Sequence, residues 1–156
     1  MSRTVSDGIL QVHWLPAVSS AAAPTVAEIA AGTDLTPYLT PDGVNFPLTQ
    51  NMVDNFGIAD TFDGQRIGTW GSSNPNLKMF RDDTDEADTF EGIARGDEGF
   101  VLISRFGAPS ATARVEVWPA QAGTPLPNPP ARNENQSYTQ GFAITSAPNL
   151  FAVVAA

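Results

Sequence analysis

A single histidine limits the acid–base chemistry that this chain could perform. Nucleophilic catalysis needs a base beside the nucleophile, whereas His13 lies in an alternating apolar segment that is typical of a strand. The sequence contains no G-x-S-x-G nucleophile elbow, and Gly71-Ser72-Ser73 is typical of a turn. The glycines Gly92, Gly96 and Gly99 do not match a phosphate-binding pattern. We therefore expect a protein that is not an enzyme and has no catalytic residues or cofactor.

Five carboxylates between Asp82 and Asp88 form the densest charged cluster of the chain. Carboxylate oxygens are ligands for hard cations such as Ca²⁺, but the run lacks the spacing and the glycine of an EF-hand loop. An acidic helix N-terminus, favoured by the helix dipole by about 0.3–1 kcal/mol per charge, is the other interpretation and the one we favour. Paired carboxylates of a glycoside hydrolase stay open, although no aromatic cluster indicates a sugar cleft. We expect no metal site.

Composition narrows the class of protein further. The chain has no cysteine, which excludes disulfides, thiol nucleophiles and Cys-based zinc sites. No apolar region of a signal peptide follows Arg3. The longest apolar stretch, residues 151–156, is far shorter than the ~20 residues that span a bilayer. We therefore expect assembly in a cytoplasm and no membrane partner.

The charge balance bears on nucleic acids. Eight basic against 17 acidic residues give a formal charge of −9. Affinity for nucleic acid comes largely from Lys and Arg that displace counterions from phosphates. We expect no tight binding, although DNA could pass close to such a surface without adhering.

The pattern of apolar residues predicts a β-rich fold. Thr25 and Glu28 have the spacing of a capping box, and Gly32 can supply a left-handed C-terminal position, so Pro24 to Gly32 predicts a short helix. The acidic run predicts a second helix, from Thr84 to Ala94. Alternation, or a continuous apolar run, predicts strands at 9–15, 60–70, 77–80, 99–105, 112–118, 138–144 and 150–154.

Turns and loops separate these elements. Thr40 to Gly43 predicts a turn, and Gly71 to Pro75 predicts a hairpin turn between the neighbouring strands. Residues 44–60 and 120–135 are predicted long loops, and residues 1–8 a flexible N-terminal arm. We expect one domain over residues 1–156 that is mainly β: an antiparallel β-sandwich or small barrel with one or two short α-helices.

Four segments in this order carry a family resemblance. They are PTVAEIAAGTDLT (24–36), GDEGFVLISR (96–105), VEVWPAQ (115–121) and PARNE leading to FAIT (130–145). Together they resemble the tail tube (major tail) proteins of long-tailed bacteriophages, of the actinobacterial siphophage type. The resemblance covers most of the chain.

The resemblance implies a function and partners. Such subunits form hexameric rings that stack along a tape-measure protein into a tube, bounded by tail-tip and tail-terminator proteins, through which viral DNA leaves. The chain would then belong to the virion tail and would be assembled in the host bacterial cytoplasm. The two long loops are candidates to bridge one ring to the next.

Residue roles follow as expectations. Asp63 and Glu116 lie on the polar phase of predicted strands, and we expect them to face the lumen. We expect contacts between subunits or rings at Val5, Phe46, Phe56, Trp118 and Tyr138. Two alternatives stay open: another virion protein, such as a capsid decoration or tail-completion protein, and a small β-sandwich binding module.

Overall fold

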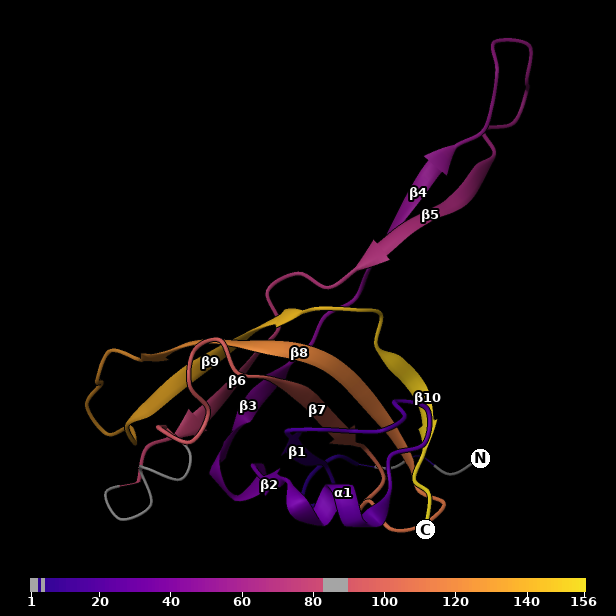
Figure 1. Ribbon diagram of the computed structural model, residues 1–156. Helices are drawn as coiled ribbons and strands as arrows, with labels where there is room; N and C mark the ends of the chain where they lie inside the picture. The colour runs from indigo at the N-terminus through magenta and orange to yellow at the C-terminus, as the bar shows by residue number, and fades with distance from the viewer. Residues whose placement is uncertain (1–2, 4, 83–89) are drawn as a thin grey trace.

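The main body of the protein is one strongly curved antiparallel sheet (Figure 1). The computed structural model describes residues 3, 5–82 and 90–156. Within them the elements in chain order are β1 (Gln11–Leu15), α1 (Val26–Ala31), β2 (Thr33–Asp34), η1 (Thr36–Tyr38), β3 (Leu39–Asn45), β4 (Thr49–Asp54), β5 (Gln65–Gly71), β6 (Asn76–Phe80), β7 (Glu98–Ser104), β8 (Arg114–Pro127), β9 (Ser137–Ile144) and β10 (Asn149–Val153). The strand order is β2-β1-β7-β8-β9-β6-β3, and β10 also pairs with β8. The mainly antiparallel β fold is confirmed, and its curled sheet is closer to the predicted small barrel than to a sandwich.

Both faces of the central strands are buried. Val101 and Ile103 of β7 point into an interior cluster enclosed by the curved sheet, which also contains Trp14 and Tyr138. Leu102 points to the opposite face, into a second cluster covered by α1. Strands buried on both faces read as continuous apolar runs, so the prediction for residues 99–105 is confirmed.

Helix α1 begins at the predicted capping box. The Thr25 hydroxyl accepts from the Glu28 amide at 3.2 Å, and the Glu28 carboxylate accepts from the Thr25 amide at 3.0 Å. The prediction for Gly32 is wrong, because its backbone is extended, with φ −81°. A glycine is needed there for a different reason: a Cβ would collide with Leu15 and the Trp14 carbonyl.

Replacing Thr25 by Ala should lower the free energy of unfolding by about 1 kcal/mol, the usual cost of losing an N-cap. Urea denaturation followed by circular dichroism measures the change. The exposed Thr33→Ala on β2 is the control and should stay within about 0.5 kcal/mol of the parent. Equal losses in the two variants would contradict a specific capping role.

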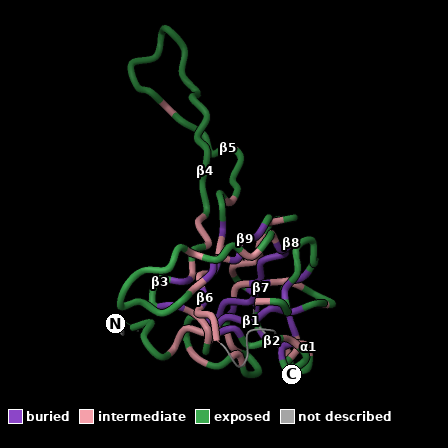
Figure 2. The backbone as a smooth tube through the Cα atoms, turned by 90° about the vertical axis from the view of Figure 1, so that its left-hand side faces the viewer, coloured by how far each residue is buried: buried purple, intermediate pink, exposed green. Residues whose placement is uncertain are grey.

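Residues 39–80 form one long hairpin that replaces several predicted turns and loops. Strands β3 and β6 pair within the body, and β4 and β5 continue as a separate pair that extends away from it (Figures 1 and 2). Neither Pro47 nor Pro75, which lie between the two halves, has an N–H, so each interrupts the ladder. We call residues 48–71 the arm.

Four local predictions are wrong in whole or in part, and strand pairing explains each of them. Residues 44–60 are only partly loop, because residues 44–45 belong to β3 and residues 49–54 form β4, which pairs with β5. Residues 40–43 lie within β3 and bulge against β6 instead of turning. Residues 71–75 connect the arm to the body and do not close a hairpin. Residues 120–135 are only partly loop, because β8 pairs with β9 as far as Pro127.

The second predicted helix falls largely on residues 83–89, outside the described residues. Its described end, residues 90–94, forms turns. Ile93 is nevertheless buried in the interior cluster, and Phe90 packs edge-on against Tyr138. Of the predicted apolar face, the described residues Phe90 and Ile93 therefore contribute to the core.

Candidate assembly surfaces

Most of the large apolar side chains that are exposed in the described part of the chain belong to the arm. Every residue of β4 is exposed, as are nearly all of β5 (Figure 2). The large apolar residues concerned are Leu48, Met52, Val53, Phe56, Ile58, Phe62, Ile67 and Trp70. Monomeric proteins rarely expose so many apolar groups together, and such surfaces mark contacts with other molecules.

The register of the arm gives it an apolar face and a more polar one. Met52 lies directly opposite Ile67, and Gln50 lies opposite Trp70. Successive residues of a strand point to opposite faces, and the register shift between Gln50 and Met52 brings Trp70 to the same face as Ile67. The other face carries Arg66 opposite Val53, and an Asn51–Thr69 hydrogen bond of 3.0 Å. We call the first of these the Met52–Ile67–Trp70 face.

Two depressions flank the base of the arm. One is a groove of about 460 Å³, lined by Ser6, Leu10, Val44, Asn45, Phe46, Pro47, Arg105 and Phe106. We call it the Phe46–Phe106 groove. The other is a pocket of about 340 Å³ lined by Trp70, Gly71, Ser72, Ile144, Ser146, Ala147 and Pro148. Both are surfaces where a neighbouring molecule could bury apolar side chains.

The structure separates the five predicted contact residues. Trp118 and Tyr138 lie in the interior cluster, at 1% and 0% exposure, so they are core residues and cannot contact another subunit directly. Phe46 is partly buried against Trp118, with ring centroids 5.1 Å apart, and lines the groove. Phe56, at the tip of the arm, and Val5 are exposed. Contacts through Val5, Phe46 and Phe56 stay predictions.

The two predicted lumen residues do not come together. Asp63 is exposed at the tip of the arm, whereas Glu116 lies on β8 in the body. The Arg105 side chain donates two hydrogen bonds to Glu116, from Nε at 3.0 Å and from Nη2 at 3.1 Å, and so offsets its charge. The lumen role of both residues stays a prediction.

Sequence patterns missed the strongest surface signal. Ile58, Phe62 and Ile67 were not expected as contacts, because an arm exposed on both faces produces no clear hydrophobic period. The available signal was the occurrence of large apolar residues within an otherwise polar stretch, where no core is expected.

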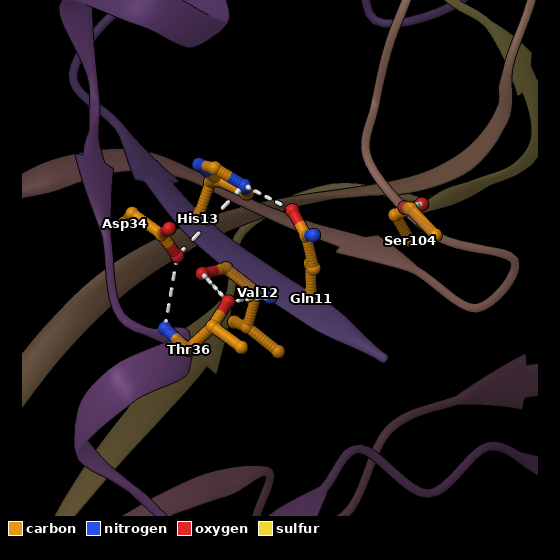
Figure 3. Close-up of polar contacts among 7 residues, drawn as sticks. Gln11, Val12, His13, Asp34, Thr36 and Ser104 are labelled. Carbon is orange, nitrogen blue, oxygen red and sulfur yellow. Dashed lines mark hydrogen bonds and ion pairs between the residues drawn. The ribbon is translucent and has the colours of Figure 1, made fainter. Parts of the chain in front are cut away.

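The only histidine belongs to a polar cluster at the β1–β2 edge of the sheet (Figure 3). His13 Nε2 lies 3.5 Å from the Gln11 side-chain oxygen and 3.9 Å from Asp34 Oδ1. Asp34 also accepts from the Thr36 amide at 3.0 Å. Ser104 on the adjacent β7 donates its hydroxyl to the Gly107 carbonyl at 2.5 Å. Its hydroxyl proton is therefore directed to backbone and not to an imidazole.

Burial lowers the pKa of His13 below its usual 6.5, and the nearby Asp34 carboxylate offsets part of that effect. As pH falls through 6.5 the unfolded chain takes up a proton that the folded chain does not yet bind, so the free energy of unfolding decreases with falling pH in that window. Denaturation midpoints measured at a series of pH values should show this decrease in the parent and a smaller one in His13→Gln. Identical profiles would contradict it.

Two further observations concern sites of other kinds. Among the described residues no three His, Cys, Asp or Glu side chains are grouped as a metal site. The acidic run beyond Asp82, for which the sequence suggests a helix N-terminus or a cation site, lies outside the described residues. No helix in the described ranges has the length and apolarity that a membrane span requires.

Comparison with known proteins identifies the class and then the family. The fold is shared with a chain from the six-fold symmetrised cryo-EM structure of the anti-feeding prophage baseplate, with a TM-score of 0.61, 9% identity, and coverage of 97% of this chain and 98% of that one. This likeness places the fold among those found in phage-like assemblies. A family model described as phage tail tube protein matches residues 1–156, so the chain belongs to that family of structural tail proteins. No curated protein matches the sequence.

Proposed function

We propose that this chain is the repeating subunit of a phage tail tube, in which six copies close into a ring and rings stack into a conduit for the genome. The observation that carries the proposal is the arm. It extends away from the curved sheet of the main body and exposes an apolar face to solvent (Figure 1). At about 3.3 Å per residue, β4 (Thr49–Asp54) alone extends roughly 20 Å, and the tip of the arm lies beyond its end. An arm of that length reaches a neighbouring copy more readily than its own body.

Contacts between different surfaces of identical copies favour open-ended assembly. Such heterologous contacts close into rings when the rotation permits and otherwise continue as filaments. Binding of the arm of one copy to a different surface of its neighbour would be a contact of this kind. The baseplate structure that contains the chain of similar fold is described as six-fold symmetrised, and this supports a ring of six copies.

The net charge fits a conduit for DNA. Six copies at −9 each would give a ring a formal charge of −54. A lumen that carries part of this charge would repel the phosphate backbone and keep DNA from adhering. Tape-measure, tail-tip and tail-terminator proteins, assembly in the host cytoplasm and the actinobacterial siphophage type belong to the same proposal.

Sedimentation velocity over a wide range of protein concentration tests the mode of assembly. An open-ended tube predicts species that grow without a fixed upper size and whose smallest closed unit contains six copies. A single trimer that does not grow further would instead support a decoration protein. A monomer that persists at every concentration, including with tail-tip seeds present, would contradict the proposal.

A further inference from the structure

The tip of the arm combines apolar anchors with negative charge only. Phe62 and Ile58 are exposed at 81% and 109% of their reference areas, and Phe56 at 47%. Residues 55–64 include Asp60 and Asp63 and no lysine or arginine. Asp60 accepts from the Gly57 amide at 2.5 Å, which leaves Asp63 as the carboxylate free for an outside partner. The tip is therefore an acidic, aromatic knob.

The Phe46–Phe106 groove is complementary to this knob. Its apolar residues are Leu10, Val44, Phe46 and Phe106, and the first three pack on the interior cluster, so the floor of the groove is held in place by the core. Of the described residues that line it, only Arg105 carries a charge, although the chain as a whole has 17 acidic and 8 basic residues. Arg105 uses two of its five N–H donors on Glu116 and can offer others.

We propose, building on the tube function above, that the arm tip of one copy docks in the Phe46–Phe106 groove of a second copy, with Phe62 and Ile58 against its apolar walls and Asp63 facing Arg105. A groove of about 460 Å³ has room for such anchors. Interfaces gain most of their affinity from buried aromatic anchors of this kind. The tip lies away from its own body in both Figure 1 and Figure 2, so the groove it fills belongs to another molecule. The proposal assigns Asp63 to a contact between copies instead of the lumen.

The lack of native cysteines makes a direct test possible. Thr61→Cys marks the tip beside Phe62, and Ser6→Cys marks the groove without removing an apolar wall. The two single variants are mixed, assembled and oxidised, and disulfide-linked dimers are resolved on a non-reducing gel. Ser146→Cys, an exposed serine in the pocket beside Trp70, is the matched control for the other depression.

In an equal mixture a Thr61→Cys arm meets a Ser6→Cys groove about half of the time, so we expect up to about half of the assembled protein to be linked between positions 61 and 6, and little between 61 and 146. Assembly that proceeds with linkage at 146 in place of 6, or with no linkage at either, would overturn the docking proposal while leaving the tube function standing. Absence of assembly in the parent chain itself would contradict both.

A charge exchange tests the contact between Asp63 and Arg105 independently. Asp63→Lys should weaken assembly, and combining it with Arg105→Glu and Glu116→Lys should restore assembly at least in part. No difference between the single and the triple variant would also count against the contact.

Discussion

Placing a charge on the apolar face of the arm should strongly raise the critical concentration for assembly and leave the subunit folded. Ile67→Asp removes an aliphatic side chain that is 76% exposed in the free subunit and introduces a carboxylate that would need burial in the assembly. Burying such a side chain contributes about 1.5–3 kcal/mol. Each 1.4 kcal/mol is a factor of ten in affinity, so the critical concentration should rise at least about 10- to 100-fold. Light scattering across a concentration series measures it.

The matched control for Ile67→Asp lies on the opposite face of the same ribbon. Val53→Asp introduces the same charge at an exposed aliphatic residue of β4 that pairs with Arg66. We expect this variant to assemble at nearly the parent concentration, and the circular dichroism of both variants to match the parent. Equal loss of assembly in the two variants would show that charge on the arm, and not the identity of the face, decides the outcome.

Trp118→Ala should destabilise the subunit itself by about 3–5 kcal/mol, the usual cost of removing a large aromatic side chain from a core. The Trp118 side chain is 1% exposed and contacts Phe46 within the interior cluster. Urea unfolding of the unassembled protein measures the loss. Since whole domains are stable by about 5–15 kcal/mol, this loss should remove a large share of the total free energy of unfolding.

Trp70→Ala is the informative counterpart, because its side chain lies on the arm at 47% exposure. Its free energy of unfolding should stay within about 0.5 kcal/mol of the parent, as is usual for surface positions, while its assembly weakens. The reverse result, a stable Trp118→Ala that fails to assemble, would support the contact role that we expected for Trp118 from the sequence.

The sequence-based predictions were most accurate for elements whose burial produces a regular pattern of apolar residues. β7 is buried on both faces and shows a continuous apolar run, whereas β9 is buried mainly on one face and shows alternation. The Thr25–Glu28 capping box is a local signal that needs no tertiary context. The long extension of β8 was missed because Pro119, Pro125 and Pro127 interrupt its pattern, yet pairing with β9 continues as far as Pro127.

The assembly surfaces were harder to predict for a related reason. Trp118 shares its strand phase with Arg114 and Glu116, but from Trp118 to Ala122 that phase of β8 points into the interior cluster, so Trp118 is a core residue. The arm has no buried face, so neither β4 nor most of β5 shows the alternation by which strands are recognised in sequence. Its register and its apolar face depend on pairing that only the folded hairpin reveals.

Negative-stain electron microscopy of the purified protein at high concentration, with the Ile67→Asp variant imaged beside it, tests the central claim most directly. The account predicts hollow tubes with a regular axial repeat and six-fold end views for the parent, and only small particles for the variant. Discrete trimers or single closed rings from the parent, or tubes that form equally well from both proteins, would contradict it.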